Sequence, residues 1–169
     1  MPIDKTELLK FLKEVDKALD KAITLTAVGG TAMTLLGTKS STIDIDFDLS
    51  REDAVVFRKA LKSLPHGYRI DIFIGGMIFS QYLPQDYIAH CRHIKSSFEK
   101  IKLLALSPLD IIVTKIGRLN ERDIEDIKAC IQKFRIGKKE VEKRAMQVVY
   151  IGHEENYKTN LAYSRKELF

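Results

Sequence analysis

Residues 42–49, which read TIDIDFDL, constrain this chain more than any other segment. Successive side chains of a strand point to opposite faces. The alternation therefore predicts a strand with an apolar face (Ile43, Ile45, Phe47, Leu49) and an acidic face (Asp44, Asp46, Asp48). Aspartate is unfavourable in strands, and carboxylates about 7 Å apart repel one another, so the acidic face is expected to bind a cation. A divalent metal ion is the natural candidate. A solvent-facing sheet surface is the plainer alternative.

Residues 68–74, which read YRIDIFI, repeat this design once. In a strand here, Arg69, Asp71 and Phe73 share the face opposite three isoleucines. If the two strands are neighbours, Asp71 joins Asp44 and Asp46. Three carboxylates can hold two metal ions about 3.5–4 Å apart, an arrangement that serves phosphoryl and nucleotidyl transfer. The alternative for Asp71 is an ion pair with a neighbouring lysine or arginine.

The sequence Gly29-Gly30-Thr31 falls where a strand predicted over residues 23–28 turns into a short helix over 31–36. Glycine lets the backbone approach a ligand closely, and the free N–H groups at a helix start favour phosphate. Two glycines alone are weak evidence for a phosphate site. Their place shortly before the acidic strand strengthens that interpretation.

The order of predicted elements indicates an α/β or α+β fold, in which a mixed sheet is flanked by helices and the C-terminal half is helical. Strands are predicted over 23–28, 42–49, 68–74 and 98–106, with helices over 4–22, 31–36, 50–64 and 86–94. Capping signals then start helices at 107 and 120, and a further helix is expected over 138–150. We expect a core over 1–106 and a helical region over 107–169, packed together as one compact unit.

Composition narrows the class of protein. Hydrophobic residues make up 45% of the chain and charged residues 30%, which excludes a disordered chain. No apolar run is long enough for a membrane span, and two well-separated cysteines indicate a reduced, cytoplasmic protein. The net charge is +5, and residues 127–139 hold five basic side chains and no acid. This stretch predicts a polyanionic partner, or else a solvated helix face.

These features together resemble the nucleotidyltransferase fold of the DNA polymerase beta superfamily. The resemblance rests on the paired glycines, the short helix, Asp44-x-Asp46 and the later strand with Asp71. Residues 107–127, SPLDIIVTKIGRLNERDIEDI, are similar to the AbiEii-like minimal nucleotidyltransferases, in which a helical Lys precedes an Arg-Asp-x-x-Asp helix. Several of those proteins are toxins of toxin–antitoxin pairs. The resemblance covers roughly residues 23 to 135.

The resemblance implies a role for each matching residue. Asp44, Asp46 and Asp71 would bind metal, with Asp71 as the base that accepts a proton from the attacking hydroxyl. Contacts to the nucleotide would come from Gly29, Gly30, Thr31, Lys115, Arg122, Asp123 and Asp126. The chain departs from many relatives at Ser40, where they carry an arginine, and Lys39 is a neighbouring substitute.

The expected function is a metal-dependent nucleotidyltransferase, which moves a nucleoside monophosphate from an NTP to an acceptor hydroxyl and releases pyrophosphate. Two Mg²⁺ or Mn²⁺ ions would accompany the NTP. The acceptor would be an RNA 3′ end, such as that of a tRNA, or a protein, and a cognate antitoxin would be a partner of a toxin. The alternative is a degenerate domain that binds a nucleotide or nucleic acid without transfer. Phosphatases and glycosyltransferases with Asp-x-Asp motifs fit this chain less well.

Overall fold

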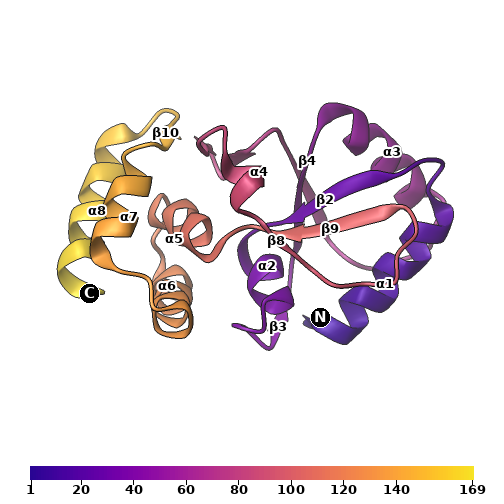
Figure 1. Ribbon diagram of the computed structural model, residues 1–169, viewed down its shortest axis with the longest axis horizontal. Coiled ribbons are helices and arrows are strands. Elements are labelled where there is room, and N and C mark those ends of the chain that lie inside the picture. Colours follow the sequence, from indigo (N-terminus) through magenta and orange to yellow (C-terminus); the bar gives the residue numbers. More distant parts are fainter. The chain divides into compact units, whose positions relative to one another are not determined.

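The computed structural model describes residues 1–169 and has a mixed α/β architecture, as the sequence predicts (Figure 1). The chain forms two compact units. The first contains Met1–Gly75 and Cys91–Ala105, and the second contains Gly76–His90 and Leu106–Phe169. None of the helices has the length and apolarity needed to cross a membrane.

A mixed sheet with the strand order β5-β4-β2-β9-β8 forms the first unit. Its strands are β2 (Ile23–Ala27), β4 (Ile45–Leu49), β5 (Ile70–Ile74), β8 (Arg92–His93) and β9 (Ile101–Ala105). The central strand β2 runs antiparallel to β4 and parallel to β9, while β4 and β5 are parallel. Two short strands, β1 (Ile3–Asp4) and β3 (Ser41–Thr42), pair with each other in a separate small sheet.

The first unit has three helices, and the first and third begin at predicted capping residues, whereas the second, predicted over 31–36, begins earlier, at Gly29. These helices are α1 (Lys5–Ala18), α2 (Gly29–Leu35) and α3 (Arg51–Lys62). Asp4 and Glu7 form a capping box at the start of α1, and Ser50 accepts a hydrogen bond from the backbone N–H of Asp53 at the start of α3. The apolar face of β4 packs against α3, where the rings of Phe47 and Phe57 meet edge to face 5.8 Å apart.

The strand predicted over residues 42–49 is interrupted, and this part of the prediction is wrong. Ile43 and Asp44 lie between β3 and β4 and belong to neither. The cause is pairing: Thr42 is opposite Ile3 in the small sheet, whereas Ile45 is opposite Ile70 in the large one. Ile43 is consequently exposed, although the three later apolar residues of the segment are buried as expected.

The second unit is mostly helical and confirms the prediction for the C-terminal half. Its elements are β6 (Met77–Ile78), β7 (Gln81–Tyr82), α4 (Tyr87–His90), α5 (Pro108–Ile116), α6 (Glu121–Phe134), α7 (Lys138–Ala145), β10 (Val149–Tyr150) and α8 (Glu154–Glu167). Helix α5 is central, with α6, α7 and α8 packed against it, and α7 and α8 lie side by side (Figure 1). Arg144 on α7 binds the buried Asp110 on α5, with 2.5 Å between Nε and Oδ1.

Besides the first helix, which is predicted over 4–22 and ends at Ala18, two further predicted helices are shorter than expected. The helix predicted over residues 86–94 ends at His90, because Arg92 and His93 pair with the end of β9 instead. The helix predicted over residues 138–150 ends at Ala145, and Val149 and Tyr150 form β10 against β7. In both places a sheet edge supplies backbone partners that the local sequence does not reveal.

Candidate functional site

The two acidic strands are neighbours, as the sequence predicts. Strand β4 runs parallel to β5, and Asp46 is in register with Asp71. One step further along the same face, Asp48 is opposite Phe73 on one side and Thr26 on the other. Residues in register on neighbouring strands point to the same face of a sheet. The structure therefore brings Asp46 and Asp71 to one face of adjacent strands.

We call Asp44, Asp46, Asp48 and the neighbouring Asp71 the acidic row. The solvent exposure of these side chains changes steeply along it. The side chains of Asp44 and Asp71 are 48% and 42% exposed. Asp46 is only 8% exposed and Asp48 only 1%. The row thus opens to solvent at its Asp44 end, where a ligand can approach, and closes at Asp48.

One guanidinium pairs with both exposed carboxylates. The Nε atom of Arg69 lies 3.9 Å from Oδ1 of Asp44 and 3.5 Å from Oδ2 of Asp71. Arg69 directly precedes β5, and its carbonyl accepts a hydrogen bond from the backbone N–H of Ile45, 3.0 Å long. An ion pair with a neighbouring basic residue was the alternative interpretation of Asp71, and in this structure the side chain makes that pair.

The glycine turn lies against the start of the acidic strand. The backbone N–H of Val28 donates to the carbonyl of Asp46, 3.1 Å away, and Gly29 then adopts a φ of +53°, a conformation that favours glycine. A Cβ on Gly30 would lie 2.9 Å from Oγ1 of Thr42, so there is no room there for a side chain. The turn is packed tightly because α2 must fit beside this strand.

Two threonine hydroxyls fix the backbone around Asp44. Oγ1 of the fully buried Thr31 accepts from the backbone N–H of Asp46 at 2.9 Å and donates to the carbonyl of Asp44 at 3.2 Å. Oγ1 of Thr42 donates to the same carbonyl at 2.8 Å. The hydroxyl of Thr31 therefore positions the acidic strand, whereas the predicted contact of Thr31 with a triphosphate remains a prediction.

The donor chemistry of the row suits a hard divalent cation. Carboxylate oxygens are preferred ligands of Mg²⁺, and Asp44 and Asp71 already converge on a single positive charge. Across residues 1–169, however, no three His, Cys, Asp or Glu side chains are gathered in a position to hold a metal ion. In this arrangement the cation between Asp44 and Asp71 is the guanidinium of Arg69.

The later predicted residues form a separate buried cluster in the second unit. Nζ of Lys115 on α5 lies 3.3 Å from Oδ1 of Asp123 and 2.9 Å from Oδ2 of Asp126, both on α6. Arg118 binds Asp123 through two hydrogen bonds of 2.8 Å. Arg122, in contrast, is exposed on α6. The nucleotide-binding roles that the resemblance gives to these residues remain predictions.

Asp123 is charged in this cluster although it is fully buried. Burial by itself raises the pKa of a carboxyl group. The hydrogen bonds from Arg118, the positive charges of Lys115 and Arg118, and the backbone N–H of Asn120 outweigh burial and hold the pKa of Asp123 below its usual value. The carboxylate also caps α6 together with Asn120, so it connects α5, the turn and α6.

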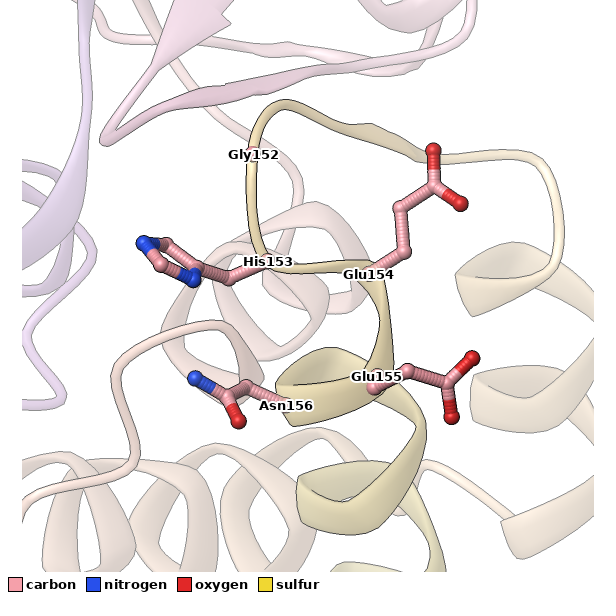
Figure 2. Close-up of a pocket in the computed structure, with 5 residues that line it drawn as sticks. All are labelled: Gly152, His153, Glu154, Glu155 and Asn156. Atoms are coloured by element: carbon pink, nitrogen blue, oxygen red, sulfur yellow. The ribbon is translucent and has the colours of Figure 1, made fainter.

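A hollow at the start of α8 is a poor candidate for a metal site. Its walls are Gly152, His153, Glu154, Glu155 and Asn156 (Figure 2). The ring of His153 points to one side of the turn, while the carboxylates of Glu154 and Glu155 point away to the other. These side chains do not converge on a common point, so they cannot share one ion.

Two residues of the clusters carry no role in the sequence-based prediction. The sequence analysis places Arg69 on the same strand face as Asp71 but gives it no function. Arg118 lies within the matched segment 107–127 and is not named there as a site residue. The spacing gave a signal for each: Arg69 shares its strand face with Asp71, and Arg118 lies one helical turn after Lys115.

The fold and the acidic strand pair fit the class of proteins that the sequence resembles. Residues 6–168 match the family described as nucleotidyltransferase of unknown function (DUF6036). Because this match spans almost the whole chain, the chain belongs to that family, and its general class is nucleotidyltransferase. The chain matches no curated protein and no solved structure.

Proposed function

We propose that this protein is a metal-dependent nucleotidyltransferase of the DNA polymerase beta superfamily, close to the AbiEii-like group. It would transfer a nucleoside monophosphate from an NTP to an acceptor hydroxyl, either on an RNA 3′ end or on a protein. The observation that carries this proposal is the register of Asp46 with Asp71 on parallel neighbouring strands, next to the glycine turn. Membership of the nucleotidyltransferase family supports the reaction class.

In this proposal Asp44, Asp46 and Asp71 hold Mg²⁺ or Mn²⁺ together with the phosphates of the NTP. The bound ions would supply charge stabilisation to the transferring phosphoryl group and to the leaving pyrophosphate. Gly29 and Gly30 would contact the triphosphate through the backbone at the start of α2, beside the acidic strand. The hydroxyls of Thr31 and Thr42 hold the backbone of Asp44, and so keep its carboxylate at the mouth of the site.

Asp71 is the carboxylate that we assign to proton transfer. Its side chain is 42% exposed, so an acceptor hydroxyl can reach it. The proton of the attacking hydroxyl passes to the carboxylate of Asp71 while the oxygen forms its bond to the α-phosphorus. The bond between the α-phosphorus and the bridging oxygen then breaks, and pyrophosphate leaves. Asp71→Asn would lower the rate strongly and leave much of the NTP affinity.

The test is pyrophosphate release from each of the four NTPs in the presence of Mg²⁺. Bulk tRNA is the first acceptor and cell extract the second. We expect turnover by the natural chain and none by Asp44→Asn or Asp46→Asn. Asp20→Asn is the matched control, because Asp20 is an exposed aspartate of the same unit that pairs with Lys59 away from the acidic row. Metal-dependent NTP binding without any turnover would indicate the alternative, a degenerate nucleotide-binding domain.

The resemblance to AbiEii-like proteins adds a finer proposal, which is a toxin role with a cognate antitoxin. Controlled expression of the natural chain would then arrest bacterial growth, while Asp44→Asn at the same protein level would not. Growth arrest by both proteins would contradict a toxin that acts through nucleotidyl transfer.

A further inference from the structure

We infer that Arg69 is a built-in counter-ion that occupies the mouth of the acidic row and has to be displaced before a divalent cation binds there. The inference rests on the proposed function, because it assigns Asp44 and Asp71 to the metal site. It adds a positioning residue that sets how strongly metal binding depends on the nucleotide.

Arg69 cannot move far from the two carboxylates. Its carbonyl accepts the backbone hydrogen bond of Ile45, so its backbone is fixed beside the start of β4. Arg69 lies just before β5, two residues before Asp71, and its Nε atom is 3.5 Å from the Asp71 carboxylate. The guanidinium therefore stays within reach of both acids whether or not it is paired with them.

The pairs that Arg69 makes are suited to exchange. Both are 3.5 Å or longer, and the Arg69 side chain is 73% exposed. Exposed ion pairs of this kind contribute little to stability. The pair between Arg118 and Asp123 is different, since it has two hydrogen bonds of 2.8 Å to a fully buried carboxylate. The structure thus contains a tight arginine pair that holds helices together and a loose one at the open end of the acidic row.

The pairs that Arg69 makes reduce the repulsion between two carboxylates. Without a cation, Asp44 and Asp71 repel each other at the same mouth. Arg69 relieves that repulsion, but a divalent cation entering the site meets the positive charge of Arg69 as well. A polyphosphate brings negative charge that can accept the displaced guanidinium through charge-assisted hydrogen bonds. Metal binding should therefore be weak alone and strong with the nucleotide.

The experiment measures Mn²⁺ binding to the full-length protein at low ionic strength, from the electron paramagnetic resonance signal of free Mn²⁺. Arg69→Gln should bind Mn²⁺ about five- to tenfold more tightly than the natural chain when no nucleotide is present. Arg69→Lys, which keeps the positive charge, should stay within about twofold of the natural chain. Arg58→Gln is the matched control, because it removes the same charge from an exposed position on α3.

A second measurement separates this role from a merely structural one. Without metal, Arg69→Gln should melt slightly below the natural chain, because Asp44 and Asp71 are left to repel each other. Added Mg²⁺ should raise its melting temperature more than that of the natural chain. A purely structural arginine would give a metal-independent loss.

The outcomes are distinct from those of the proposed function. Equal or weaker Mn²⁺ binding by Arg69→Gln, with metal binding still intact in the presence of an NTP, overturns the inference alone. An equal gain in Arg58→Gln also overturns it, because the effect would then be one of overall charge. Absence of metal binding in every protein, with or without an NTP, overturns both this inference and the metal-dependent function.

Discussion

The aspartates of the acidic row differ most in how much solvent they meet. Asp44 is half exposed, Asp46 is 8% exposed, and Asp48 is 1% exposed and faces Thr26 and Phe73. Asp48 also lies about 7 Å beyond Asp46, at about 3.3 Å per residue along the strand. This distance is too great for Asp48 to share the same pair of ions without movement of the backbone.

We therefore expect the three Asp→Asn changes to have unequal effects. Asp44→Asn and Asp46→Asn should abolish nucleotidyl transfer, because metal stabilisation of the transition state is worth several kcal/mol. Asp48→Asn should lower the rate only modestly and leave metal-dependent NTP binding in place. Pyrophosphate release and NTP titration, each with and without EDTA, check both statements. If Asp48→Asn were as inactive as Asp44→Asn, the metal site would be misplaced along the strand.

Gly30 permits a second prediction, about stability. In Gly30→Ala the new Cβ would lie 2.9 Å from Oγ1 of Thr42, so the threonine must shift and weaken its hydrogen bond to the carbonyl of Asp44. We expect a loss of about 1 kcal/mol in the free energy of unfolding, measured by urea denaturation. Gly67→Ala is the control, since nothing lies within 4 Å of its Cβ. Equal stability of both variants would show that Thr42 yields at no cost.

The residues that the sequence did not assign are those whose role depends on a tertiary partner. Asp46 and Asp48 were predictable, because alternation along one strand is a local signal, whereas Asp44 lies in the bend before β4. The role of Arg69 was not, because its two partners lie on different segments. Thr31 has an assigned nucleotide contact, but the bonds of its hydroxyl to the backbone of Asp44 and Asp46 are visible only in the fold.

At the scale of elements, one buried carboxylate joins α1 to β9. Asp16 on α1 accepts hydrogen bonds from the backbone N–H groups of Glu99, Lys100 and Ile101, with lengths of 2.8–3.0 Å. Burial opposes its charge, but these three hydrogen bonds and the charge of Lys13 outweigh burial and lower the pKa of Asp16. The carboxylate thereby satisfies the donors at the start of a central strand.

This contact gives a prediction for the effect of pH. A carboxyl group whose pKa is lower in the folded state than in the unfolded state stabilises the fold at pH values above the unfolded-state pKa, which is near 4. That stabilisation is lost as the pH falls through the folded-state pKa. Asp16→Asn should lose about 1–3 kcal/mol of unfolding free energy at pH 7. The difference from the natural chain should shrink between about pH 5 and pH 3, as measured by urea denaturation.

Glu52→Gln serves as the control for this pH series, because Glu52 is an exposed acid of α3. Its difference from the natural chain should stay small at every pH. If the difference in unfolding free energy between Asp16→Asn and the natural chain did not change with pH, the charge of Asp16 would not be its cause. The loss would then come from the poorer fit of the amide.

The sequence predicted the longer elements better than the short ones. Caps at Asp4, Ser50, Ser107 and Asn120 start four helices where the sequence predicts them. Strands β3, β8 and β10 have two residues each, too few for a periodic pattern, and their pairing partners decide them. The helical content near residues 92 and 149 was overestimated for this reason.

At the scale of the whole molecule, the two units draw on non-contiguous parts of the chain. Segment Gly76–His90 belongs with the later helices, while Cys91–Ala105 completes the sheet of the first unit. Long-range membership of this kind is not visible in local composition. The sequence-based division of the chain at residue 106 remains a prediction about domain organisation. The two compact units describe only which segments pack together.

Charge is the other property of the whole chain, and a basic stretch without acids, residues 127–139, lies in the second unit. Lys128, Lys133, Arg135, Lys138 and Lys139 are all exposed, at the end of α6 and the start of α7. If this basic surface binds the RNA acceptor, the logarithm of the binding constant should fall with the logarithm of salt concentration. The slope for a single strand is about −0.7 per phosphate contacted.

The last prediction tests this surface by removal of its positive charges. Replacement of Lys133, Arg135, Lys138 and Lys139 by Gln should weaken RNA binding and flatten the salt slope by up to about 3, because each lost contact removes about 0.7. NTP binding should be unchanged. The control replaces four exposed lysines at the N-terminus, Lys5, Lys10, Lys17 and Lys21, which makes the same change in net charge. Equal flattening in both variants would show that net charge alone draws RNA to the protein, and no flattening in either would make residues 127–139 a solvated helix face.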